Sequence, residues 1–285
     1  MKIGIGLPNP VPGTPGRTLV EWSRRAEELG FTSLATIDRV AYPSYESLIA
    51  LAAAAAVTEK VSLFTNVLLG PTRDAVMLAK QAASVDQISD GRLLLGLGVG
   101  FREDDFSLVG QGYADRGKRF DEMLTTMKRV WRGEILEGTS KEVAPRPVNG
   151  AVPIVIGGTV DAAFRRTVEH AVGWTAGGAP PEQVAPLVEK ARAAWSAAGK
   201  EGQPGIWALT YFAFGDDAEE RAAAYLTDYY GEWGGAMAAG IPKNADQLRE
   251  RIDAFAAVGV DELLLDPTIG ELDQLERAAE AALGR

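Results

Sequence analysis

Residues Arg92–Phe106 read RLLLGLGVGFREDDF, and this stretch decides between two kinds of α/β fold. Gly96, Gly98 and Gly100 give the spacing G-x-G-x-G, and Phe101 stands where a dinucleotide-binding fingerprint has its third glycine. That fingerprint also follows the first strand of its unit and opens a helix. Here at least three strand-like segments come earlier, and the charges after Phe101 suit a helix on a sheet poorly. The stretch is therefore predicted to be a strand whose end carries almost no side chains.

Strand-like segments alternate with helical patterns along the whole chain. Eight strands are predicted, at Lys2–Leu7, Thr32–Ile37, Val61–Leu69, Arg92–Gly98, Val152–Gly157, Gly173–Gly177, Ile206–Phe214 and Asp261–Asp266. Each is followed by a helical pattern, which predicts an α/β protein with one (β/α)8 TIM barrel domain over residues 1–285 and insertions at its C-terminal mouth. A doubly wound open sheet is the competing architecture.

Composition narrows the class of function. The formal net charge of −10 disfavours a general role in binding nucleic acid or anionic membranes. The absence of cysteine removes disulfides and thiolate metal sites, and a single histidine, His170, leaves no zinc site of the multi-histidine type. We therefore expect no metal. The longest apolar run, Leu48–Val57, is shorter than the roughly 20 residues of a membrane span, and the N-terminus lacks the apolar core of a signal peptide. A soluble cytoplasmic protein is the default expectation.

A barrel places function at the C-terminal ends of its strands. The predicted ends of strands four, five and six are rich in small residues, which let a flat ligand approach the backbone. These candidates for ligand binding are Gly98, Val99, Gly100, Gly157, Gly158, Thr159, Thr175, Ala176 and Gly177. The alternative is that the glycines relieve crowding or form bulges.

Three of the strand ends carry polar side chains or lead into a helix. Thr159 is placed to cap a helix that begins near Val160, so that free backbone N–H groups face an anion such as phosphate; an ordinary capped helix is the alternative. Asp38 and Arg39 end the second strand, either as an active-site pair or as a solvated loop pair. Asn66 is polar in an apolar strand and either bonds a ring edge or marks a bulge. The charges of Arg102–Asp105 are expected mostly to face water.

Several motifs together resemble those of the bacterial luciferase-like monooxygenase family. The segment LAKQAASVDQISDGRLLLGLGVGFREDDF (Leu78–Phe106) carries the resemblance most strongly. The opening MKIGIGLP, GFTSLATIDR at the second strand and RGKRFDEMLTTMKRVW (Arg116–Trp131) support it. The segment VPIVIGGTVDAAFRRTVEHAVGWTAGG resembles the family motif that lies on the side of the cofactor's phosphate. Single motifs are moderately specific, but their order and spacing cover essentially the whole chain.

The resemblance implies a barrel that binds FMN, or the deazaflavin coenzyme F-420, at its C-terminal mouth. It places Asn66 and Val67 under the isoalloxazine ring and implies a cis peptide bond between them. Gly98 and Gly100 would lie beside the ring or the ribityl chain. Gly157, Gly158 and Thr159 would hold the phosphate, and the segment from Thr175 to Gly177 would line the same side.

One departure from the family pattern favours one branch of its chemistry. Many deazaflavin-dependent relatives have Asp-His at the second strand end, where this chain has Asp38 and Arg39. Histidine moves a proton near neutral pH, whereas arginine stays charged and is suited to stabilising an anion. The leading hypothesis is therefore a monooxygenase that uses reduced FMN and molecular oxygen on a small organic substrate, with Asp38 and Arg39 as catalytic candidates.

The alternatives are a deazaflavin-dependent reductase or dehydrogenase, a non-catalytic flavin-binding protein and, more distantly, a phosphosugar isomerase. A nicotinamide-binding domain is not recognisable, so a separate flavin reductase is the expected supplier of reduced flavin. Segments Phe101–Arg116 and Tyr225–Pro242 are candidate lids, and their candidate substrate contacts are Phe101, Tyr229, Tyr230 and Trp233. The Ala-rich helix predicted at Glu46–Thr58 either packs on the barrel or joins two copies in a homodimer.

Overall fold

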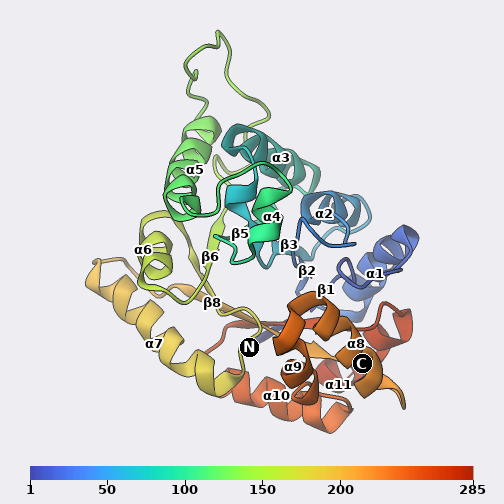
Figure 1. Ribbon diagram of the computed structural model, residues 1–285. Coiled ribbons are helices and arrows are strands. Elements are labelled where there is room, and N and C mark those ends of the chain that lie inside the picture. Colours follow the sequence, from blue (N-terminus) through green and yellow to red (C-terminus); the bar gives the residue numbers. More distant parts are fainter. Residues whose placement is uncertain (285) are drawn as a thin grey trace.

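The strands of the computed structural model, which describes residues 1–284, form one parallel sheet (Figure 1). Its order is β3-β2-β1-β9-β8-β7-β6-β5-β4, and β3 also pairs with β5, which closes the sheet into a barrel. The strands are β1 (Lys2–Gly6), β2 (Ser33–Thr36), β3 (Ser62–Thr65), β4 (Leu68–Leu69), β5 (Leu93–Gly98), β6 (Ile154–Gly157), β7 (Gly173–Thr175), β8 (Gly205–Phe212) and β9 (Glu262–Pro267). The barrel prediction is confirmed, and the open sheet is wrong.

The third barrel position is occupied by two short strands instead of the one predicted over Val61–Leu69. β3 ends at Thr65 and β4 begins at Leu68, and each pairs with a different part of β5. The peptide bond between Asn66 and Val67 is cis, as predicted. With β3 and β4 counted together, the barrel has eight strand positions.

Helices surround the strands in the order expected of βα units (Figure 1). The first, α1 (Gly16–Leu29), buries Leu19, Trp22, Ala26 and Leu29, a spacing of three and four residues that places all four side chains on one helical face. It ends at Gly30, whose φ of 93° is the left-handed conformation favoured by glycine. The other outer helices are α2 (Ser47–Ala55), α3 (Ala75–Ile88), α5 (Arg116–Trp131), α6 (Asp161–His170), α7 (Pro181–Ala197), α10 (Ala245–Ala257) and α11 (Leu272–Leu283).

Two insertions interrupt the simple βα alternation, at the places predicted for lids. The segment after β5 contains the short helix α4 (Glu103–Ser107) before α5 begins. The segment after β8 contains α8 (Ala218–Tyr230), the 3-10 turn η2 (Gly231–Trp233) and α9 (Gly234–Ala239) before α10. A further 3-10 turn, η1 (Gly70–Thr72), links β4 to α3.

The core has two buried clusters. The larger joins the strands to the outer helices and includes the fully buried Trp22, Trp131 and Trp174. The smaller includes Phe64 of β3 and Tyr211 of β8 and continues into the second insertion. In the part of the chain that the structure describes, every helix is too short or too polar to span a membrane.

Candidate functional site

The glycines that end β5 and β6 leave room for the side chain of Val67. A Cβ atom added at Gly98 would lie 2.7 Å from Cγ2 of Val67, and one added at Gly157 would lie 3.0 Å from its Cγ1. Val67 therefore fills the space toward which a Cβ of Gly98 would point, and a role of Gly98 beside a ligand stays a prediction. Val67, held between the two glycines, presents the apolar surface at this point of the mouth.

Asn66 is fixed by a neighbour three strand positions away around the barrel. Thr175, the last residue of β7, donates a hydrogen bond from Oγ1 to Oδ1 of Asn66 at 2.8 Å, and both side chains are buried. The Nδ2 atom of Asn66 is also buried and has no hydrogen-bond partner among residues 1–284. A buried donor without an acceptor is costly, so this amide group is suited to a polar ligand atom.

The loop after β6 presents free backbone donors, but Thr159 does not cap the next helix. The N-cap of α6 is Val160, and its side chain cannot accept a hydrogen bond, so the predicted cap is wrong. The N–H groups of Gly158 and Thr159 have no backbone acceptor among the residues described, and both residues are exposed. Gly177 after β7 has a φ of 66° and open space where a Cβ would point.

Three remaining candidates at these strand ends pack against the protein itself. Gly100 has a φ of 80°, and a Cβ there would lie 3.2 Å from the ring of Phe106. Val99 and Ala176 are half-buried and pack against the larger core cluster. These three positions shape the mouth through contacts within the chain.

Asp38 connects the end of β2 to the turn that follows the cis peptide. Its Oδ2 accepts a hydrogen bond from the backbone N–H of Leu69 at 2.9 Å and forms an ion pair with Arg73 at 2.8 Å. The side chain of Asp38 is only 3% exposed. In this arrangement its carboxylate is used to hold β4 in place.

Arg39 is buried in ion pairs with the first insertion. Its Nη2 lies 2.8 Å from Oδ2 of Asp104, and its Nε lies 3.6 Å from Oδ2 of Asp105. Asp105 is 1% exposed and also accepts hydrogen bonds from the backbone N–H groups of Val40 and Ala41. The expectation that these charges mostly face water is wrong for Asp105, because α4 turns this carboxylate toward the end of β2.

Aromatic side chains of the second insertion close over the mouth. The hydroxyl oxygens of Tyr211 and Tyr230 lie 2.7 Å apart, and the ring of Tyr229 packs edge-on against that of Tyr230. Arg102 lies 5.3 Å from both of these ring centroids and donates to the carbonyl oxygen of Tyr229. Tyr229 is therefore part of the packed lid, whereas Tyr230 reaches the space beneath it.

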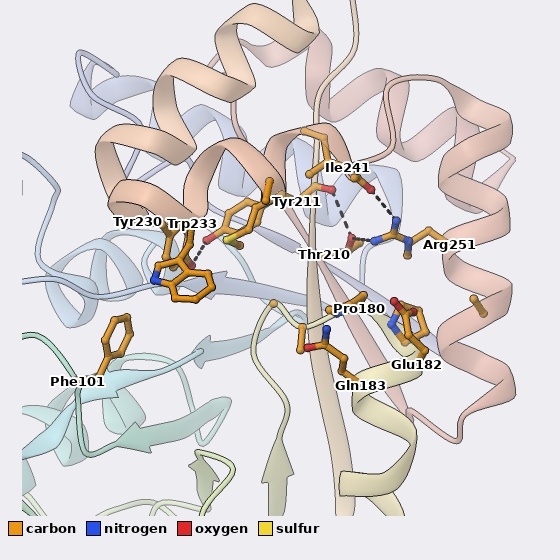
Figure 2. Close-up of a pocket in the computed structure, with 17 residues that line it drawn as sticks. Phe101, Pro180, Glu182, Gln183, Thr210, Tyr211, Tyr230, Trp233, Ile241 and Arg251 are labelled. Atoms are coloured by element: carbon orange, nitrogen blue, oxygen red, sulfur yellow. Dashed lines mark hydrogen bonds between the residues drawn. The ribbon is translucent and has the colours of Figure 1, made fainter.

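A cavity of about 950 Å³ lies between the two insertions and the ends of β7 and β8 (Figure 2). Phe101 and Trp233 line it from the two insertions, and they are 67% and 76% exposed. Tyr211, Tyr230 and Met237 extend this wall. The opposite side is formed by the Gly178–Gln183 segment, Thr210, Arg251 and neighbouring residues. Three of the four predicted substrate contacts, Phe101, Tyr230 and Trp233, thus come together, and Tyr229 lies behind them.

The buried acid Asp266 stands at the C-terminal end of a barrel strand and was not among the predicted site residues. It stands at the end of β9, paired in register with Tyr211 of β8, and its Oδ2 has no hydrogen-bond partner in the described chain. A Cβ at Gly6 would lie 2.0 Å from its Oδ1, so the absent side chain of Gly6 makes room for this carboxyl group. Burial raises the pKa of Asp266 to about 8. The sequence signal was an acid directly after three leucines at a predicted strand end.

A parallel barrel with a lidded apolar cavity at the ends of its strands defines an enzyme of the TIM-barrel class. Residues 1–281 match the family model described as luciferase-like monooxygenase. The chain belongs to the luciferase-like monooxygenase family.

The chain is also similar to individual proteins. An uncharacterized protein of Mycobacterium tuberculosis is 28% identical over 228 residues, which cover 70% of this chain and 78% of the relative. The FMNH(2)-dependent dimethylsulfone monooxygenase of Pseudomonas putida is 26% identical over 65% of this chain and 53% of its own. The monooxygenase RslO1 of Streptomyces bottropensis is 25% identical, with a TM-score of 0.81 over 100% of this chain and 99% of its own.

Two more distant structures share the fold. The coenzyme F420-dependent tetrahydromethanopterin reductase of Methanopyrus kandleri gives a TM-score of 0.79 at 18% identity, covering 100% of this chain and 99% of its own. The oxygenating constituent of 3,6-diketocamphane monooxygenase of Pseudomonas putida, solved with FMN, gives 0.76 at 17% identity, covering 98% and 96%. The same barrel is thus found in proteins named for FMN and for the deazaflavin coenzyme.

Proposed function

We propose that this protein is a flavin-dependent monooxygenase that uses reduced FMN and molecular oxygen on a small organic substrate. The observation that carries the proposal is the lidded cavity of about 950 Å³ at the mouth of a barrel of this family. The FMNH(2)-dependent relative supports FMN as the flavin. Residues 1–285 would act as one catalytic domain.

The residues at the mouth fit a flavin. The unpartnered Nδ2 of Asn66 is suited to a carbonyl oxygen or ring nitrogen, and the side chain of Val67 offers an apolar contact to a flat ring. The free N–H groups of Gly158 and Thr159, ahead of α6, suit a phosphate. Gly177 leaves open space near the same side. Donor types and small residues thus match a molecule that has both a ring and a phosphate.

The side chains of the protein would bind and orient the flavin and the substrate and shield them from water. Thr175 holds the Asn66 amide so that Nδ2 is directed away from it, and Asp38 fixes the neighbouring β4 through Leu69 and Arg73. We therefore assign Asp38 and Arg39 positioning roles, since both are bound within the protein. Bound reduced flavin supplies the electrons for oxygen activation. Phe101, Tyr230 and Trp233 would contact the substrate and exclude water from it.

Two partners belong to this proposal. A separate reductase would supply the reduced flavin. The protein would also form a homodimer through α2 and α3, where Ile49 and Met77 are exposed while Ala50, Ala54 and Ala55 of α2 are buried. Light scattering on the purified protein tests the second point, and a monomer would contradict it.

Anaerobic titration of the purified protein with reduced FMN, oxidised FMN and deazaflavin tests the proposed cofactor. Reduced FMN is expected to bind more tightly than the other two. When oxygen is admitted, an oxygenated product should form only if a suitable substrate candidate has been added. Tight deazaflavin binding without FMN affinity would favour a deazaflavin-dependent reductase or dehydrogenase. FMN binding without turnover of any substrate would favour a flavin-binding protein.

A further inference from the structure

Arg251 of α10 stands at the outer end of the cavity, on the side away from Phe101 and Trp233 (Figure 2). Its Nη2 donates to the carbonyl oxygen of Gly240 at 2.7 Å, and its Nη1 lies 3.5 Å from Oγ1 of Thr210 at the mouth of β8. These two contacts hold the guanidinium group along the cavity wall. Arg251 also borders a smaller adjoining recess of about 280 Å³, which shares Gly240 and Ile241 with the main cavity.

The charge of Arg251 is not neutralised by a contacting carboxylate. In the described part of the chain, no Asp or Glu oxygen lies within 4.0 Å of it, although the protein has a net charge of −10 and many paired arginines. Partial burial lowers its pKa, which means that the charged form has lost part of its hydration. A partly desolvated cation without a counterion favours an anion that enters the cavity.

The surrounding groups are consistent with an anionic head group. The exposed residue Gln183, which carries a carboxamide, also lines the cavity. Glu182, in the first turn of α7, is the acidic residue among those that line the cavity, and its field acts on Arg251 across a distance longer than an ion pair. Glu182 is exposed, so solvent screens its charge more than that of the half-buried Arg251.

The opposite wall is apolar and aromatic. Phe101, Tyr230, Trp233 and Met237 line it, and their side chains offer no charge. A ligand that fills the cavity would therefore place an apolar body against the aromatic side chains and an acidic group against Arg251 (Figure 2).

We propose that Arg251 is a specificity-determining residue that binds the carboxylate or phosphate group of an organic substrate with an apolar, ring-sized body. This inference rests on the proposed function, because it names the substrate class of the same site. It assigns the anion to the substrate because the free donors suited to the cofactor's phosphate follow β6, whereas Arg251 contacts Thr210 of β8, two strands along the sheet.

Calorimetric titration of the whole protein with benzoate, phenyl phosphate and neutral benzamide tests the proposal without turnover. In the unmodified protein, benzoate or phenyl phosphate should bind more tightly than benzamide. Arg251→Gln should weaken binding of the anions about tenfold or more and leave benzamide unchanged. Arg251→Lys should retain part of the preference, and Glu182→Gln should strengthen anion binding. The comparison of the two anions shows which acidic group is preferred.

Arg249→Gln is the matched control, because Arg249 lies on the same helix but pairs with Asp246 at the surface. Equal benzoate affinity in Arg251→Gln and the unmodified protein would overturn the proposal, as would weaker FMN binding with unchanged benzoate binding. Failure of all proteins to bind reduced FMN, with benzoate binding still dependent on Arg251, would contradict the proposed function and leave the anion site standing. Circular dichroism confirms that each variant is folded.

Discussion

The Nη1 atom of Arg39 donates a hydrogen bond to the carbonyl oxygen of Tyr229 at 3.2 Å. This contact joins the end of β2 to the last turn of α8, where the carbonyl groups of a helix favour a cation. Arg102 donates to the same carbonyl oxygen at 2.9 Å, so two arginines from separate strand ends meet one residue of the second insertion. Since Arg39 also binds Asp104 and Asp105, it links both insertions to the barrel.

Replacement of Arg39 by Met should destabilise the fold more than any change to its exposed partner. The variant leaves Asp105 buried without a cation, and breaking a buried pair in this way costs about 3–5 kcal/mol. Asp104→Asn removes the 57%-exposed partner and should cost less than about 1 kcal/mol. Urea unfolding followed by circular dichroism gives both values. Equal effects of the two changes would show that the buried contact with Asp105 contributes little.

Asp38→Asn should weaken flavin binding through the geometry of β4. The neutral amide loses the charge-assisted contact with Arg73 and can present a donor toward the N–H of Leu69, so the segment with Asn66 and Val67 is held less firmly. We expect the dissociation constant of reduced FMN to rise about tenfold, measured by anaerobic fluorescence titration. Glu46→Gln is the control, since Glu46 contacts the same Arg73 but is 39% exposed. An unchanged FMN affinity in Asp38→Asn would contradict the proposed positioning role of Asp38.

A methyl group at Gly98 should conflict with Val67, and shortening Val67 should relieve the conflict. The added Cβ of Gly98→Ala would lie 2.7 Å from Cγ2 of Val67, so we expect destabilisation of about 1–3 kcal/mol. In the double variant with Val67→Ala, the loss should be smaller than the sum of the two single losses. Gly235→Ala in α9 is the control, because a Cβ there has open space. If the losses in free energy of unfolding are additive, the added methyl group does not conflict with Val67.

The sequence predicted the barrel, the order of its strands and the cis bond, but not which atoms occupy the mouth. Strand and helix periodicities are local, so they were visible in segments such as Arg92–Gly98. The relationship between Gly98 and Val67 joins the end of β5 to the link between β3 and β4, and only the closed barrel brings them together. Asp105 is a similar case, because its burial depends on how α4 turns toward β2. Glycine patterns therefore indicated a need for space without showing what fills it.

Only some of the residues that line the cavity were predicted, because local sequence patterns do not show long-range packing. Phe101, Tyr230 and Trp233 stood out as aromatic residues in irregular, glycine-containing segments, and the structure brings them to one wall. Arg251 gave no such signal, since α10 has the charge pattern of an ordinary surface helix. Its contact with Thr210 depends on the packing of α10 beside β8. Long-range packing of this kind is absent from local sequence patterns.

Asp266 should make the fold less stable as the pH rises from about 4 to 8. Burial raises its pKa from 3.8 to about 8, so within this range the folded protein holds a proton that the unfolded chain releases. The free energy of unfolding then falls by up to about 1.4 kcal/mol per pH unit, and the full loss is reached above the folded pKa. The neighbouring tyrosines Tyr211, Tyr225 and Tyr230 have raised pKa values and do not titrate in this range.

Comparison with Asp266→Asn isolates this contribution, because asparagine keeps the shape and does not titrate. The difference in free energy of unfolding between variant and unmodified protein, from urea denaturation at pH 5, 6, 7 and 8, should shift in favour of the variant as the pH rises. A pH-independent cost of the amide cancels in this slope, as do contributions of other groups such as His170. Asp246→Asn, at the surface, should give no such slope. A difference that stays constant across the range would mean that Asp266 is ionised in the folded protein and has a partner for its charge there.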